Sequence, residues 1–66
     1  MSNKVAGYRI IAGLTQAQMA EKLHISTNTY RNKEKGKSFF TSDEMKIFTD
    51  LVKNVISDAK MESIFF

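Results

Sequence analysis

The chain has 66 residues, a formal net charge of +3 and no cysteine, which is enough length for one small domain spanning residues 1–66. Without cysteine it has neither disulfides nor thiolate zinc sites, and its single histidine does not make a metal site. No stretch reaches the roughly 18 consecutive apolar residues of a membrane span, so we expect a cytoplasmic protein. The absence of proline and the low glycine content favour an all-α fold.

Charge is distributed unevenly along the chain. Residues 1–40 contain seven Lys or Arg against two Glu, a net charge of +5, whereas residues 41–66 contain three Lys against five acidic residues, a net charge of −2. A basic half beside a mildly acidic half favours binding to a polyanion such as nucleic acid. Basic clusters also occur on plain solvated surfaces, so charge alone does not decide the function.

Apolar spacing and residues that end helices divide the chain into four helices. We expect them over residues 3–12, 15–23, 26–35 and from residue 41 to about residue 56. A break at residues 57–60 follows, and the last six residues form either one more turn or a short extended tail. The predicted architecture is a four- to five-helix all-α domain.

Three of the helix starts share one capping pattern. Thr15, Ser26 and Thr41 are the N-caps, and each has an apolar residue one position before it and another four positions after it. Gln18 and Glu44, three positions after Thr15 and Thr41, complete capping boxes at two of these starts. Because three separate starts agree, these boundaries are the best-supported part of the secondary-structure prediction.

The expected core residues recur at helical spacing on the inward faces of the helices: Val5, Tyr8, Ala12, Met19, Ala20, Leu23, Met45, Phe48, Leu51, Val52, Val55 and Ile56. Ile64, Phe65 and Phe66 at the end of the chain have two interpretations. They either fold back on the first helix near Val5 and Ile11 and complete the core, or they form part of a subunit interface. We favour the core, because so small a domain needs the buried area.

The third helix is unusually polar. Between Ser26 and Lys37, Tyr30 is the only large apolar residue, so burial alone cannot hold this helix on a core. A short turn joins it to the second helix, which is the arrangement of a helix-turn-helix with its core at residues 15–36. The second helix would hold the third, whose polar face is then available to enter the DNA major groove.

The segment AGLTQAQMAEKLHISTNTYRNKEKGKS (residues 12–38) resembles the helix-turn-helix of the XRE family, the lambda-repressor-like fold of phage repressors and Cro-type regulators. The resemblance covers about residues 3–56. The matching residues occur at the family's relative spacing without a gap: Arg9, Gly13, Leu14, Thr15, Gln16, Met19, Ala20, Leu23, Ile25, Ser26, Thr29, Tyr30, Glu34, Gly36 and Lys37.

The resemblance implies roles for individual side chains. The expected base-reading residues, whose polar groups suit base edges, are Thr27, Asn28, Thr29, Arg31 and Asn32, with Thr29 and Arg31 nearer to the backbone or groove wall. The expected phosphate-binding residues are Gln16, Lys35, Lys37 and Ser38, and Gln16 would also brace the reading helix. Arg9 and Glu34 would form an internal ion pair between the first and third helices.

Two residues depart from the family pattern. His24 stands in the turn where the family usually has Gly, and if this position needs a positive φ, His tolerates it better than a β-branched residue would. Lys33 stands where the family often has a hydrophobic residue. We expect its stem to pack on the domain while its amine reaches solvent.

These patterns predict a sequence-specific regulator of transcription that binds double-stranded DNA, of the phage or prophage repressor or Cro type. One module reads few base pairs, so we expect a near-palindromic operator and a homodimer, in solution or on DNA. The alternative is a protein-interaction module, an antirepressor or antitoxin-like partner with the same fold. We expect no enzyme activity, cofactor, metal, membrane contact or small-molecule ligand.

Overall fold

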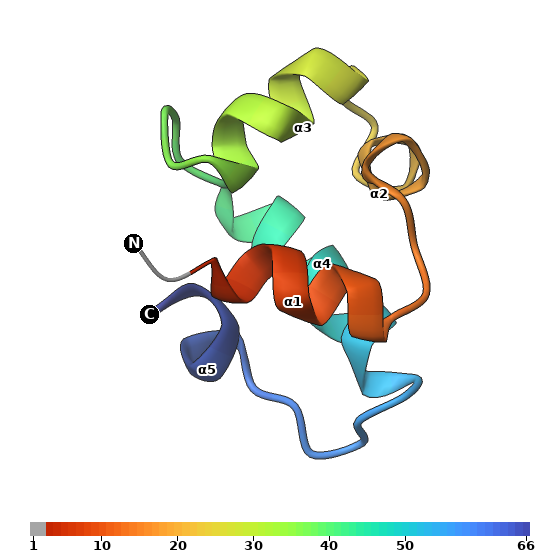
Figure 1. The fold of residues 1–66 in the computed structure, drawn as a ribbon. Helices are drawn as coiled ribbons and strands as arrows, with labels where there is room; N and C mark the ends of the chain where they lie inside the picture. Colours follow the sequence, from red (N-terminus) through yellow and green to blue (C-terminus); the bar gives the residue numbers. More distant parts are fainter. Residues whose placement is uncertain (1–2) are drawn as a thin grey trace.

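The computed structural model describes residues 3–66 and has five helices and no strand over these residues. The helices are α1 (Lys4–Ile11), α2 (Gln16–Lys22), α3 (Thr27–Glu34), α4 (Ser42–Lys53) and α5 (Met61–Phe65) (Figure 1). The predicted all-α class is therefore confirmed. None of the helices in the described range has the length and apolar character needed to cross a bilayer.

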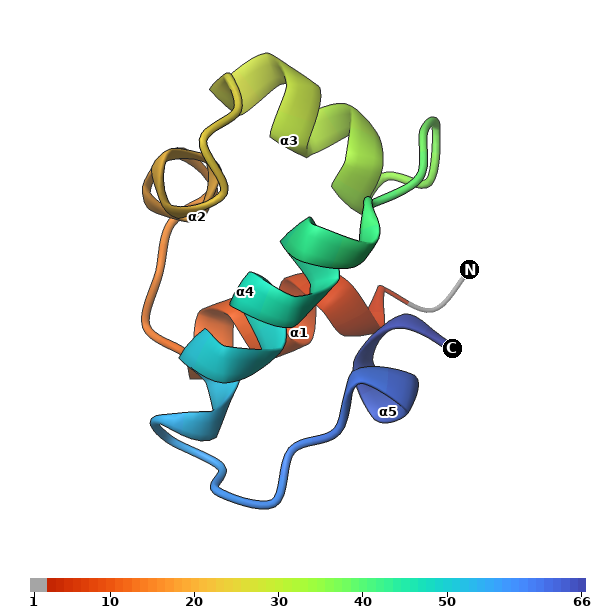
Figure 2. The same ribbon diagram turned by 180° about the vertical axis from the view of Figure 1, so that it is seen from behind.

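The helices form two groups in space. α2 packs on α3 at one end of the molecule, at the top of Figure 1. α1 and α4 contact each other below this pair, and α5 packs against both of them, as the reverse view in Figure 2 also shows. The five helices thus enclose one core, which contains buried residues of α2 and α3 as well as of α4 and α5.

The helix starts follow the predicted caps. Thr15 Oγ1 accepts a hydrogen bond from the Gln18 amide at 3.1 Å, and Gln18 Oε1 accepts one from the Thr15 amide at 2.9 Å. Thr41 and Glu44 make the same reciprocal pair at 3.1 and 2.8 Å. Ser26 Oγ accepts from the amide of the residue three positions later at 3.1 Å. These bonds satisfy amides that have no partner within their helices.

The core contains most of the predicted residues. Its buried apolar side chains come from all of the helices except α1, and from the segment before α5: Met19, Ala20, Leu23, Tyr30, Phe48, Val52, Ala59 and Ile64. The predicted face of α1, Val5, Tyr8 and Ala12, is half-buried and packs against this cluster. The prediction for Val55 is wrong, because α4 ends at Lys53 and Val55 is 59% exposed. Helical spacing does not apply beyond the end of a helix.

The end of the chain joins the core. α5 forms the extra turn, Ile64 is buried, and the ring of Phe65 lies 5.2 Å from the rings of both Phe40 and Phe48 in edge-to-face geometry. Phe66 remains 78% exposed. The core interpretation is therefore confirmed for Ile64 and Phe65 but not for Phe66.

The turn between α2 and α3 is tight and depends on one left-handed residue. His24 has φ 61°, so the position does require the positive φ that we named as a condition in the sequence analysis. The Ile25 amide donates to the Ala20 carbonyl at 3.0 Å, which closes the end of α2. Ser26, the N-cap of α3, follows Ile25 directly, so this turn sets the orientation of α3 relative to α2.

Candidate nucleic-acid interface

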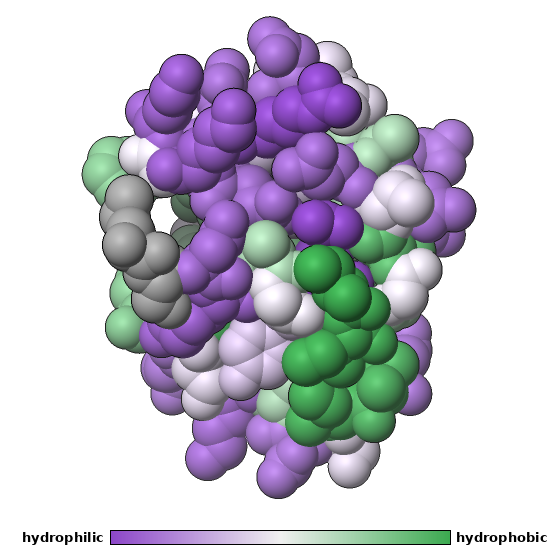
Figure 3. All heavy atoms as spheres, viewed as in Figure 1, coloured by the Kyte–Doolittle hydropathy of each residue, from purple (hydrophilic) through white to green (hydrophobic). Residues whose placement is uncertain are grey.

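The outward face of α3 is polar, and its centre is unoccupied by the rest of the protein. Tyr30 is fully buried and marks the inward face, so at about 100° per residue Asn28 and Asn32 lie nearly opposite it. Asn28 is exposed and Asn32 is half-buried. Within residues 3–66 the side-chain hydrogen bonds of α3 involve other residues, and neither asparagine amide takes part. Figure 3 shows the hydrophilic surface over this end of the molecule.

The two flanks of this face differ. Arg31 is exposed on the side of α2, and its Nε donates to Gln16 Oε1 at 3.1 Å. Thr27, one turn earlier, is half-buried. On the other flank the Thr29 hydroxyl accepts a hydrogen bond from Ser26 Oγ at 2.8 Å, so it belongs to the cap at the start of α3. Of the five predicted base-reading residues, Thr27, Asn28 and Asn32 make no side-chain hydrogen bond within residues 3–66, and of these three Asn28 is exposed.

The end of α3 and the loop after it carry three of the four predicted phosphate-binding residues, and Gln16 lies apart from them in α2. Lys35, Lys37 and Ser38 are exposed, and Gly36 turns the chain with φ 85°. The ion pairs in residues 3–66 use other lysines and arginines, so the charges of Lys35 and Lys37 face solvent. A solvated cationic loop next to a polar helix face is a suitable arrangement for a phosphate backbone.

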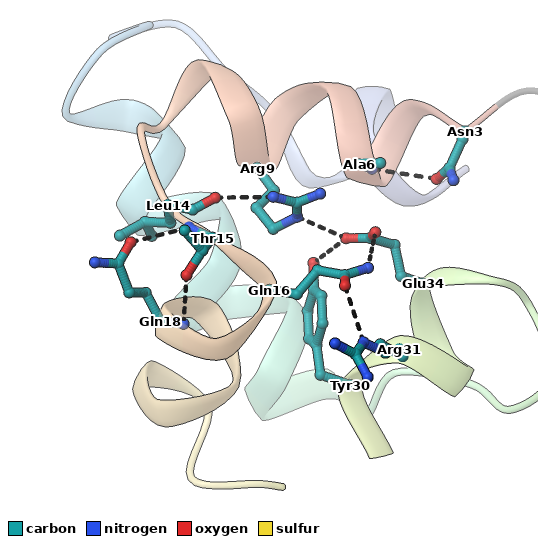
Figure 4. A network of polar contacts seen from close by, with 10 residues as sticks. All are labelled: Asn3, Ala6, Arg9, Leu14, Thr15, Gln16, Gln18, Tyr30, Arg31 and Glu34. Atoms are coloured by element: carbon teal, nitrogen blue, oxygen red, sulfur yellow. Dashed lines mark hydrogen bonds and ion pairs between the residues drawn. The ribbon is translucent and has the colours of Figure 1, made fainter. Parts of the chain in front are cut away.

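The predicted ion pair between Arg9 and Glu34 is present, and it belongs to a larger network (Figure 4). Glu34 Oε2 accepts from Arg9 Nε at 2.9 Å and from the Tyr30 hydroxyl at 2.6 Å, while Glu34 Oε1 accepts from Gln16 Nε2 at 2.9 Å. Arg9 Nη1 also donates to the Leu14 carbonyl at 2.9 Å. The Glu34 side chain is only 4% exposed, so one buried carboxylate ties α1, α2 and α3 together.

Burial and hydrogen bonding compete at this carboxylate. Burial alone would raise the pKa of Glu34, but the hydrogen bonds from Arg9, Tyr30 and Gln16 outweigh it and hold the pKa below its usual value. Burial, followed by the hydrogen bond to Glu34, raises the pKa of Tyr30 well above that of a free phenol. Glu34 is therefore charged and Tyr30 neutral at physiological pH, which is the state that their hydrogen bond requires.

Gln16 makes more contacts within the protein than its predicted role requires. Its amide nitrogen donates to Glu34 and its amide oxygen accepts from Arg31, and the residue is half-buried. The bracing of α3 that we expected of Gln16 is visible in these two bonds. Phosphate binding by Gln16 stays a prediction. Sequence reasoning missed the contact with Arg31, because nothing in the local pattern joins residues fifteen positions apart.

The prediction for Lys33 is wrong in one respect. Its amine does not reach solvent: Nζ lies 2.6 Å from Glu44 Oε1, and the Lys33 side chain is 11% exposed. Burial would raise the pKa of Glu44, but hydrogen bonds from Lys33 and from the Thr41 amide lower it overall. The carboxylate of a capping box thus also anchors the C-terminal end of α3, a second use that the capping pattern does not reveal.

The described part of the chain has no cluster of three or more His, Asp or Glu side chains placed to hold a metal ion. Comparison of the chain with protein families, characterised proteins and solved structures gives no match. The features that bear on function are therefore the geometry of α3 and its surroundings.

Proposed function

We propose that this protein is a sequence-specific regulator of transcription that binds double-stranded DNA through a helix-turn-helix formed by α2 and α3. In this proposal the domain is a lambda-repressor-like fold of the XRE type, and the protein is a phage- or prophage-type repressor or Cro-like regulator. Helix α3, with its caps at residues 26 and 35, enters the major groove. The partner is a near-palindromic operator bound by two copies of the chain.

One observation carries the proposal: the face of α3 opposite Tyr30 presents Asn28 and Asn32 with amides that no protein group in residues 3–66 engages. An asparagine amide can bond the N6 and N7 positions of adenine at once, which makes it suitable for reading base edges. The exposed cations of Lys35 and Lys37 adjoin this face and suit the phosphate backbone.

The direct experiment is selection of bound sites from random DNA duplexes, followed by affinity measurements on the selected site over a range of salt concentrations. We expect an enriched near-palindrome whose half-sites are about one helical turn apart. Affinity should fall steeply as salt rises, because phosphate contacts release counterions. Absence of duplex binding at low salt would contradict the proposal and favour a protein-interaction module.

Two substitutions test the division between reading and anchoring residues. Asn28→Ala should cost about 1–3 kcal/mol of binding free energy on the selected site and blur the preference at one base pair. Lys37→Ala should weaken binding to all duplexes alike and reduce the salt slope by about 1. If both variants changed affinity in the same way on every duplex, the division would be wrong.

A further inference from the structure

We propose that Gln16 is a positioning residue that holds the Arg31 guanidinium ready to clamp a DNA phosphate beside α3. The expected direct phosphate contact of Gln16 is thereby replaced by a contact that Arg31 makes. The inference rests on the proposed DNA-binding function and assigns each of these two residues a separate part in it.

The orientation of the Gln16 amide follows from its neighbours. The ionised carboxylate of Glu34 only accepts hydrogen bonds, and the guanidinium of Arg31 only donates them. The amide nitrogen therefore faces Glu34 at 2.9 Å and the oxygen faces Arg31 Nε at 3.1 Å, as Figure 4 shows. The amide group connects a buried anion to an exposed cation, and neither end can be reversed without losing both bonds.

The Gln16 amide is itself held firmly. Glu34 is fixed by Arg9 from α1 and by Tyr30 from α3, so the carboxylate that accepts from Gln16 has little freedom. Because the Gln16 amide is fixed by the buried network, its oxygen holds the Arg31 guanidinium in one orientation. A long exposed arginine otherwise loses conformational entropy when it binds a ligand, and a side chain that is already oriented loses less.

Arg31 keeps the groups that a phosphate needs. Only its Nε is engaged, so the terminal Nη groups have no protein partner within residues 3–66. A guanidinium binds phosphate oxygens with two parallel N–H groups, and Arg is always charged. Gln16 is half-buried and neutral, and both ends of its amide are engaged, which makes it the weaker phosphate ligand of the two.

The place of Arg31 on α3 favours a phosphate over a base. It lies a quarter turn from Tyr30, on the flank that faces the start of α2, whereas Asn28 and Asn32 occupy the centre of the outward face. A helix that inserts its centre into the groove brings its flanks to the groove walls, where the phosphates are. Arg31 should therefore add affinity without adding sequence preference.

The first test uses the free protein. The Arg31 Nε–H proton, followed by ¹⁵N NMR, should exchange with water more slowly in the folded protein than in urea-unfolded protein. The substitution Gln16→Met keeps a side chain of similar length without polar atoms and should abolish that protection. Equal exchange rates in folded and unfolded wild-type protein would overturn the proposal, whatever the stability of the variant.

The second test is a double-mutant cycle on duplex DNA, with every variant measured where circular dichroism shows it folded. Arg31→Ala should weaken binding about tenfold, equally on selected and unrelated duplexes. Gln16→Met should cause a smaller uniform loss, and the double variant should bind no more weakly than Arg31→Ala. Lys53→Ala, which removes a cation at the far end of α4, is the matched charge control and should change affinity little.

Two failures are distinguishable. Wild-type protein that binds no duplex at low salt would overturn the proposed function and the clamp together. Losses that multiply in the double variant, in a protein that does bind DNA, would overturn the clamp alone, because Gln16 would then contribute independently of Arg31.

Discussion

The outward and inward faces of α3 both carry polar residues, but they lie in opposite surroundings. On the outward face, Asn28 projects away from the protein and makes no side-chain hydrogen bond within the described residues. On the inward side, the side chains of Lys33 and Glu34 are only 11% and 4% exposed, and each is paired with an ion from another helix. Polar residues on the inward side thus hold the helix in place, and those on the outward face are available for a partner. Substitutions on the two faces should therefore affect different measurements.

The largest expected effect is on stability, from Glu34→Ala. The substitution leaves the mostly buried Arg9 guanidinium without its partner and removes the acceptor of Tyr30 and Gln16. We expect a loss of unfolding free energy on the order of 3 kcal/mol, measured by urea denaturation. Glu62→Ala, which removes an exposed carboxylate from α5, is the control. An unchanged midpoint for Glu34→Ala would show that the network is not needed to hold α3.

Lys33→Met should have the next largest effect. It removes the amine that bonds Glu44 and leaves a buried carboxylate with only its capping contact to Thr41. We expect a loss of about 1–3 kcal/mol in unfolding free energy. Lys35→Met is a matched control two residues away, because Lys35 is exposed. If the two variants lost the same unfolding free energy, the ion pair of Lys33 with Glu44 would not stabilise the protein.

Acidification should weaken the ion pairs that hold the inward face of α3 and should lower stability. Glu34 and Glu44 both have a pKa in the folded protein below the ordinary value of 4.5, so folding is favoured by their ionised forms. Their contribution is complete above the unfolded-state pKa and is lost as pH falls below about 4.5 through the folded-state pKa. Urea midpoints from pH 7 to pH 3 should fall accordingly, and less steeply for Glu34→Gln. A parallel fall for wild type and variant would contradict this assignment.

The smallest effect on stability is expected on the outward face of α3. Asn28→Ala should change the unfolding free energy by no more than about 0.5 kcal/mol, since the side chain is solvated and unbonded. The same variant should be impaired in DNA recognition. Thermal melts of Asn28→Ala and Glu34→Ala, measured side by side, compare the outward and inward faces of α3 directly. A large stability loss in Asn28→Ala would mean that the outward face of α3 has a structural role.

The starts of three helices could be predicted because their causes are local. The caps at Thr15, Ser26 and Thr41 depend on side chains within three residues, and all three are observed. Arg9 and Glu34 could be paired only through the family resemblance, since the two residues are far apart in the chain. The accessible face of α3 followed from helical spacing once Tyr30 was taken as its anchor.

The features that sequence reasoning missed depend on long-range packing. The Lys33–Glu44 pair joins two helices across the loop that follows α3. The sequence pattern assigned Glu44 to the capping box with Thr41, so it did not indicate a second partner. Gln16 meets Arg31 only because α2 and α3 cross where they do. Val55 was misplaced because α4 ends at Lys53, two residues earlier, so the helical spacing used to place Val55 in the core does not reach it.

The convergence of three donors on Glu34 has an evolutionary consequence. Arg9, Gln16 and Tyr30 come from three different helices, and each donates to the same carboxylate. Changing any one of them alone removes a donor from the buried carboxylate, and changing Glu34 removes the acceptor of all three. In a lineage of sequences that share this domain, positions 9, 16, 30 and 34 should therefore co-vary, whereas under the proposed function the solvent-facing positions of α3 should diverge with the DNA site.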